Sequence, residues 1–149
     1  MTGSAKPMRR ILVVEDIAMI AEFIELILQR SDFQVSGIVD SGEDAINSVL
    51  VDPPDLVLMD IKLRGFVDGI EAAKIIRNNT DIPVLFVSAH TDPEMIRKAF
   101  AAGASGYVIK PFKGKELLAS LEKVFDGGEI VPSACGPAGS CHPRSLRPV

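Results

Sequence analysis

The chain has 149 residues, which fits one folded domain, and its 47% hydrophobic and 24% charged residues are typical of a globular protein rather than a disordered chain. A net charge of −4 argues against a nucleic-acid partner, since nucleic-acid binders usually carry a basic excess. No apolar run approaches the roughly 18 residues of a membrane span and the N-terminus lacks a secretory signal, so we expect a cytoplasmic protein without a membrane partner.

Short apolar runs alternate five times along the chain with segments of helical period. The predicted strands are residues 11–14, 35–39, 56–59, 84–87 and 107–109. The predicted helices are residues 17–30, 43–50, 70–78, 93–102 and 114–125. Four of the five runs are rich in valine and isoleucine, which is typical of parallel strands covered on both faces.

Local signals support the helix boundaries. Ser41 and Asp92 stand where N-caps belong, and Gly103 stands where a left-handed C-cap would follow the fourth helix. An apolar stripe marks the first helix; its members are Ile17, Ile20, Ile24, Ile27 and Leu28. Five alternating pairs predict a doubly wound α/β fold, a parallel sheet with right-handed crossovers between two helical layers.

The predicted folded unit covers residues 9–125. Residues 1–8 are expected to be a flexible N-terminus, and residues 126–149 a disordered tail, because residues 127–149 contain four prolines and four glycines without apolar periodicity. Cys135, Cys141 and His142 in this tail are too few for a closed zinc site. We therefore expect no metal site there, and the role of the tail stays open.

Polar residues follow the ends of four predicted strands. Glu15 and Asp16 follow the first strand, Asp60 the third, Ser88 the fourth and Lys110 the fifth. A single such residue is often only a cap, but ligand sites of open α/β sheets lie at these strand ends. If the strands lie in the order 2-1-3-4-5, the three carboxylates converge, and they repel one another unless a cation lies among them or their pKa values rise. The pattern predicts a Mg²⁺ or Mn²⁺ site beside a pocket for a dianion.

Five sequence motifs carry a family resemblance. They are VVED at 13–16, MDIKL at 59–63, DGIEAA at 68–73, VSAH at 87–90 and GASGYVIKPF at 103–112. Residues 9–125 resemble the receiver domain of bacterial two-component response regulators, including single-domain chemotaxis regulators. The resemblance implies a flavodoxin-like (βα)5 three-layer sandwich with the sheet order 2-1-3-4-5.

The resemblance assigns the acidic residues to phosphoryl transfer. It implies that Asp60 accepts a phosphoryl group from the phosphohistidine of a histidine kinase or a histidine phosphotransfer protein. Asp16 and Asp60 would bind Mg²⁺ directly, Glu15 would bind it through water, and the backbone carbonyl of Lys62 would be a further ligand. Mn²⁺ is an expected substitute for Mg²⁺.

The remaining motif residues resemble the family's switch. Lys110 would pair with a phosphoryl oxygen, and Ser88 would donate a hydrogen bond to the phosphoryl group once it is present. Tyr107 occupies the position of an aromatic residue that then turns inward, although it is equally a residue type found buried in strands. The fourth helix, fifth strand and fifth helix would form the signalling face. The Lys110–Pro111 bond resembles the family's cis peptide.

The loop after Asp60 departs from many receivers. They place a Met-Pro pair where this chain has Leu63 and Arg64, and their glycine comes one residue earlier than Gly69. The shape of this longer loop is left open. Lys62 and His90 each lie two residues past a key residue. In the family such positions tune the lifetime of the phosphoaspartate, but either residue is equally consistent with a solvated loop position.

Three functions are compared. The leading hypothesis is a stand-alone receiver that catalyses only its own phosphorylation and dephosphorylation and binds an unknown downstream protein; dimerisation through the signalling face is left open. A phosphatase of the haloacid dehalogenase type is disfavoured, because its nucleophile follows the first strand and carries an aspartate where this chain has Lys62. A scaffold that binds partners without phosphorylation is disfavoured by the intact Asp16, Asp60, Ser88 and Lys110.

Overall fold

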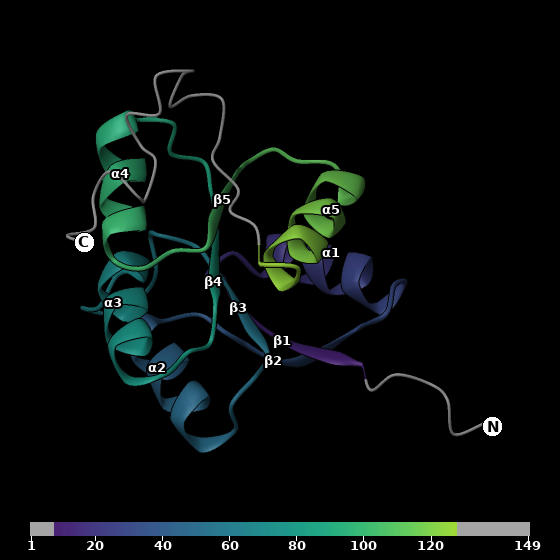
Figure 1. Cartoon of the computed structure of the whole chain (residues 1–149), viewed down its shortest axis with the longest axis horizontal. Coiled ribbons are helices and arrows are strands. Elements are labelled where there is room, and N and C mark those ends of the chain that lie inside the picture. The colour runs from purple at the N-terminus through teal and green to yellow at the C-terminus, as the bar shows by residue number, and fades with distance from the viewer. Residues whose placement is uncertain (1–7, 128–149) are drawn as a thin grey trace.

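The computed structural model describes residues 8–127 as a parallel sheet of five strands between two helical layers (Figure 1). The strands are β1 (Arg9–Val14), β2 (Phe33–Val39), β3 (Leu56–Met59), β4 (Val84–Ser88) and β5 (Gly106–Ile109). The helices are α1 (Ala18–Gln29), α2 (Gly42–Val51), α3 (Gly69–Asn79), α4 (Pro93–Ala101) and α5 (Gly114–Phe125). The sheet order is β2-β1-β3-β4-β5, which confirms the predicted flavodoxin-like fold.

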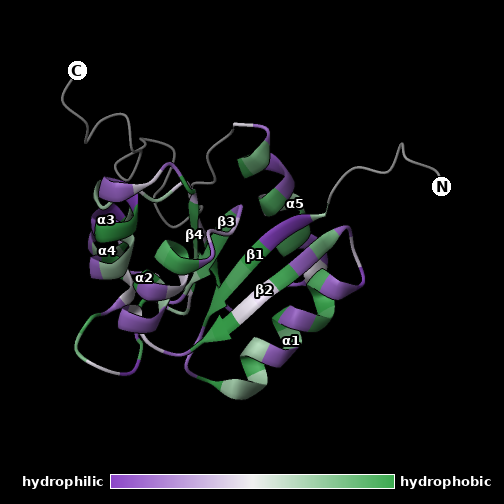
Figure 2. Cartoon of the chain, turned by 90° about the horizontal axis from the view of Figure 1, so that it is seen from below, coloured by the Kyte–Doolittle hydropathy of each residue, from purple (hydrophilic) through white to green (hydrophobic). Residues whose placement is uncertain are grey.

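Strands β3 and β4 are buried on both faces, and so are most residues of β1 and β5, because successive side chains point to opposite sides of the sheet. The edge strand β2 is only partly buried. In β1, Ile11 and Val13 belong to a core shared with α1 and α5. Leu12 and Val14 belong to the second core, shared with α2, α3 and α4. Figure 1 shows the two helical layers on either side of the sheet, and Figure 2 shows the apolar strands β1 and β3 between them. The apolar runs of β1, β3, β4 and β5 are therefore doubly covered strands, as predicted. The prediction is wrong for β2, which lies at the edge of the sheet and is only partly covered.

The predicted helix boundaries lie within one residue of those observed, and their caps are formed. The Ser41 side chain accepts the backbone N–H of Asp44 at 3.1 Å. Asp92 likewise accepts the N–H of Glu94 at 3.1 Å. Gly103 has φ +106°, the left-handed conformation expected after a helix.

Ile17 is a correction to the predicted stripe of α1. The residue precedes the helix as its N-cap and is 51% exposed, whereas Ala21 is buried on the inner face. The apolar period identified the helix but could not locate its first turn. Ile17 lies in the connection between β1 and α1 and packs in neither of the two cores.

Strand β1 begins two residues before its predicted start, at polar Arg9 rather than at the apolar run. The backbone N–H of Arg10 donates to Asp55 Oδ2 at 2.7 Å, and the N–H of Asp55 donates to the Arg10 carbonyl at 2.8 Å. These bonds hold a polar segment in the sheet, which hydrophobic patterning alone does not detect.

Some predictions fall outside the part of the chain that the structure describes. Residues 1–7 and 128–149 lie there, and with them Cys135, Cys141, His142 and most of the predicted flexible ends. Among residues 8–127, no helix combines the length and apolar character that crossing a bilayer requires.

Candidate functional site

Strand register brings the ends of β1 and β3 together. Val14 pairs with Met59 in the last rung of the two strands. The hydrogen bonding continues one residue further, where the N–H of Asp60 donates to the Val14 carbonyl at 3.0 Å. On the other side of β1, the N–H of Glu15 donates to the Val39 carbonyl of β2 at 2.9 Å. Glu15 and Asp60 are therefore fixed by the backbone at the carboxyl edge of the sheet.

The three predicted carboxylates form one cluster. Glu15, Asp16 and Asp60 each offer an oxygen, and these oxygens all lie within 4.8 Å of one another. Burial raises the pKa of Glu15 to about 6, and the charge of Asp60 adds to the rise. Hard oxygen donors at this spacing fit Mg²⁺, whose charge would offset the repulsion among the carboxylates. The donor set and its spacing thus agree with the predicted metal.

Lys110 projects into this cluster from the end of β5. Its Nζ donates to Glu15 Oε1 at 2.6 Å and to Asp60 Oδ2 at 3.1 Å. Desolvation lowers the pKa of the ammonium, but the hydrogen bond to Glu15 and the charge of Asp60 outweigh this effect, so the pKa is raised. Lys110 therefore stays charged and partly neutralises both carboxylates. The sequence did not predict the pairing with Glu15, because the two residues lie on strands that are not neighbours.

Ser88 and Tyr107 hold the backbone of His90 from two sides. Ser88 is fully buried, and its Oγ accepts the N–H of His90 at 3.2 Å. The Tyr107 hydroxyl donates to the His90 carbonyl at 2.9 Å, and its ring packs 6.1 Å from that of Phe86. Tyr107 already lies inside, in the position that the resemblance assigns to the phosphorylated form. The role of Tyr107 as a switch stays a prediction. The Lys110–Pro111 peptide bond is cis, as the resemblance implied.

The loop between β3 and α3 is closed at its neck by three residues. The buried N–H of Ile61 donates to Asp60 Oδ1 at 2.7 Å, which orients the carboxylate. The N–H of Gly69 donates to the Ile61 carbonyl at 2.7 Å. A Cβ atom at Gly69 would lie 1.9 Å from the Asp60 carbonyl oxygen, so only glycine allows this approach. The motif had marked Gly69 by position, but its contact with the site was not visible in the sequence.

The predicted Lys62 and His90 lie at the margin of the site. The Lys62 residue is exposed and His90 is half-buried. Sequence reasoning missed Glu43, which accepts the N–H of Phe66 in the loop at 3.1 Å. Acidic residues are common in the first turn of a helix, where the helix dipole favours them. The sequence therefore gave no indication that Glu43 also contacts the loop.

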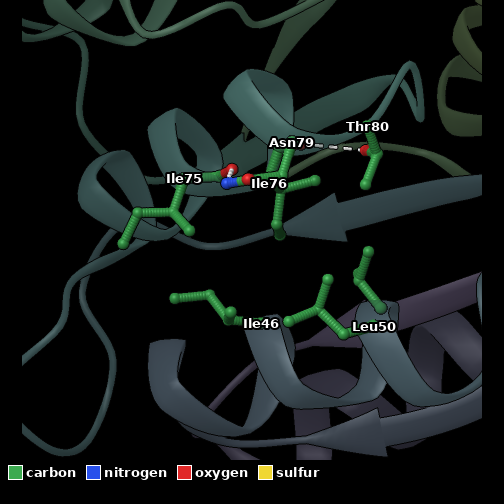
Figure 3. A pocket seen from close by; sticks show the side chains of 7 residues that line it. Ile46, Leu50, Ile75, Ile76, Asn79 and Thr80 are labelled. Atoms are coloured by element: carbon green, nitrogen blue, oxygen red, sulfur yellow. Dashed lines mark hydrogen bonds between the residues drawn. The ribbon is translucent and has the colours of Figure 1, made fainter.

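Two hollows in the described part of the chain differ in their volume and in their distance from the carboxylate cluster. An apolar hollow of about 400 Å³ borders Lys110, and its other lining residues are Ile20, Phe23, Ala89, Pro111 and Phe112. A smaller one of about 20 Å³ lies between α2 and α3 (Figure 3). Asn79 and Thr80 in its lining already donate to the carbonyls of Ile75 and Ile76. The smaller hollow is a packing gap between helices, whereas the larger one adjoins the site.

The model of the response regulator receiver domain matches residues 11–122, which include all the clustered residues. The chain belongs to this family. Receiver domains are signalling domains that histidine kinases phosphorylate, and they bind Mg²⁺ through an acidic cluster such as that of Glu15, Asp16 and Asp60.

Individual relatives agree with this assignment. The chain is 36% identical over 113 residues to the DNA-binding response regulator MtrA of Mycobacterium tuberculosis H37Rv, covering 76% of this chain and 49% of that protein. It is 37% identical over 115 residues to the transcriptional regulatory protein CseB of Streptomyces coelicolor, covering 77% and 48%. A LuxR-family response regulator from Aurantimonas sp. SI85-9A1 is 29% identical with a TM-score of 0.79, covering 93% of this chain and 99% of that one. The chain spans about half the length of the curated relatives it matches.

Proposed function

We propose that this receiver accepts a phosphoryl group on Asp60 from the phosphohistidine of a histidine kinase or a histidine phosphotransfer protein. One observation carries the proposal. Asp60 is only 8% exposed, and its carboxylate is held between the N–H of Ile61 and the Nζ of Lys110, inside a cluster that fits Mg²⁺. A carboxylate that serves only as a cap needs neither a charged lysine nor two neighbouring acids.

The chemistry follows from this environment. An oxygen of Asp60 attacks the phosphorus, the P–N bond to the donor imidazole breaks, and its electron pair stays on the nitrogen, which takes a proton from solvent. Bound Mg²⁺ supplies positive charge that neutralises the phosphoryl oxygens. Lys110 adds a second positive charge, since its Nζ already contacts Asp60. The Ile61 amide keeps the nucleophile oriented throughout.

A protein donor suits the surroundings of Asp60. The apolar hollow beside Lys110 is lined by Ile20, Phe23 and Phe112, and Phe23 is 48% exposed. A small phosphodonor gains little from this surface. A protein that brings its phosphohistidine to Asp60 can cover it and gain the free energy of apolar burial.

The output is proposed to be a change of the α4, β5 and α5 face. A phosphoryl oxygen beside Ser88 would accept its O–H and draw Oγ toward the site, and the N–H of His90 is bound to the same Oγ. Tyr107 follows because its hydroxyl is bonded to the His90 carbonyl. This chain of contacts leads from the site to β5 and to α4, which begins at Pro93. Binding of a downstream protein or a second copy through this face is the proposed readout.

Incubation with Mg²⁺ and acetyl phosphate tests the proposal directly. Intact mass spectrometry should show the gain of one phosphoryl group, and beryllofluoride should change the NMR signals of Ser88, His90 and Tyr107. A chain that neither gains mass nor responds to beryllofluoride would be a scaffold. Multiple turnover of small phosphate esters would instead indicate a phosphatase. Whether the receiver works as a stand-alone unit, and without nucleic acid, stays a prediction.

Lys62 and His90 are proposed to tune the phosphoryl lifetime. The Lys62 residue is exposed and His90 is half-buried, so both can affect how water reaches the phosphorylated Asp60. Lys62→Ala and His90→Ala should change the first-order dephosphorylation rate measured after removal of acetyl phosphate. Asp81→Asn is the control, since this exposed residue precedes β4 at the opposite edge of the sheet. Rates equal to wild type in both variants would dispose of the tuning role.

A further inference from the structure

The β3–α3 loop is one residue longer than in many receivers, and it is hydrogen-bonded to one carboxylate of α2. Glu43 lies in the first turn of α2, and its Oε2 accepts the N–H of Phe66 at 3.1 Å. The Phe66 side chain is fully exposed and contributes no core contact. Leu63 and Val67 on either side of the tip pack against the core, whereas the tip itself is held through its backbone. Hydrogen bonds from the amides of Phe66, Glu43 itself and Val67 keep the pKa of Glu43 below its usual range.

Gly65 fits the loop around the Glu43 carboxylate. It has φ +87°, which favours glycine, and a Cβ atom there would lie 2.7 Å from Glu43 Oε1. The loop tip thus passes close to the Glu43 carboxylate, and a side chain at residue 65 would need that carboxylate to move and the backbone to keep an unfavourable conformation. This approach explains how an extra residue is accommodated without a core of its own.

Arg64 links the same loop to Asp40, which lies just before α2. Its N–H donates to the Asp40 carbonyl at 3.1 Å, and its Nε lies 3.3 Å from Asp40 Oδ2. Both groups of this ion pair are more than half exposed, so solvent screening makes it weak. The bond from Phe66 to Glu43 is also exposed, but it is charge-assisted and its donor is a backbone amide, so only the Glu43 side chain has to be ordered to form it. Glu43 is therefore the better-defined of the two side-chain anchors.

We propose that Glu43 is a positioning residue for the Mg²⁺ site, because it fixes the loop that begins with Lys62, whose backbone carbonyl is the predicted further ligand. This inference rests on the proposed function. The loop neck is already closed by the bond from Gly69 to Ile61. Glu43 closes the outer part, so residues 62–66 are held at both ends. Groups that orient metal ligands contribute to affinity without touching the metal.

Isothermal titration of Mg²⁺ into the full chain tests this role. Glu43→Ala should raise the Mg²⁺ dissociation constant by up to about tenfold, the low end of the range for groups bonded directly to a metal ligand, because Glu43 acts on Lys62 through Phe66. Glu43→Gln should recover most of the affinity, since its amide oxygen can accept the Phe66 N–H. Glu43→Asp keeps the charge but is one methylene too short, and it should behave like alanine. The Phe66 amide NMR signal should move in the alanine and aspartate variants and return in the glutamine variant.

Asp44→Ala is the matched control, because Asp44 is the other acid in the first turn of α2 and its removal changes the net charge equally. It should bind Mg²⁺ like wild type. Equal weakening in Glu43→Ala and Asp44→Ala would show that only charge matters and would overturn the inference. Unchanged affinity in Glu43→Ala would also overturn it while leaving the Mg²⁺ site intact. If the wild-type chain does not bind Mg²⁺, the metal site of the proposed function is wrong, and so is this inference.

Discussion

An Asp60→Asn variant should take up no phosphoryl group from acetyl phosphate with Mg²⁺, under conditions in which the wild-type chain gains one. The amide that replaces the carboxylate is not a nucleophile, and it removes one of the three anionic oxygens that fit the metal. Intact mass spectrometry measures the result directly. Because the substitution removes the nucleophilic carboxylate itself, phosphorylation should be abolished rather than slowed.

The variant should remain folded, which separates chemistry from stability. An amide oxygen at position 60 can still accept the N–H of Ile61, and Lys110 keeps its 2.6 Å bond to Glu15. Burial is the main cause of the raised pKa of Glu15, and loss of the Asp60 charge removes the repulsion that adds to it. We therefore expect a Tm at or above that of wild type, while Asp81→Asn should be phosphorylated normally. Phosphorylation of Asp60→Asn at another residue would contradict the assignment of the acceptor.

Gly69→Ala should cost the protein about 3 kcal/mol in the free energy of unfolding, which is the upper end of the usual range for a forced overlap in a packed region. The added Cβ would lie 1.9 Å from a backbone oxygen, and no flexible side chain can move aside to relieve the contact. The backbone of Asp60 or of α3 must shift instead. Phosphorylation by acetyl phosphate should slow as well, because the displaced carbonyl belongs to the acceptor residue. Urea unfolding and the rate of mass gain measure the two effects.

Gly114→Ala is the matched control for this substitution. Gly114 is also the first residue of its helix, but a Cβ there would meet only side-chain carbons of Ile27, at 3.5 Å or more. Alanine should be neutral or stabilise α5 by up to about 1 kcal/mol, since it lowers the entropy of the unfolded chain. Similar losses in the two variants would show that a helix start disfavours alanine in general, and that Gly69 has no special contact.

The alternation of apolar runs and helical periods was enough to predict the layers of this fold, because each doubly covered strand must be apolar throughout. The order of the strands depended on the family resemblance, since periodicity does not say which strand neighbours which. Strand ends then placed Glu15, Asp16 and Asp60 together. What periodicity missed are contacts between residues far apart in sequence. The pairing of Lys110 with Glu15 depends on how far a side chain reaches across the sheet, and the use of Glu43 depends on loop shape.

The hydrogen bond between Ile61 and Gly69 separates the loop of residues 62–68 from the strand and helix on either side of it. The loop can change in length and sequence more freely than these two elements. Because the amide of Gly69 is bonded across to Ile61, residues 62–68 form a compact excursion whose ends are in contact. An insertion within the excursion lengthens it without displacing Asp60 from β3 or α3 from the sheet. Loop length can therefore vary between relatives while the position of the acceptor is kept. An engineer could exchange these residues as a cassette to alter metal affinity or partner choice without rebuilding the sheet.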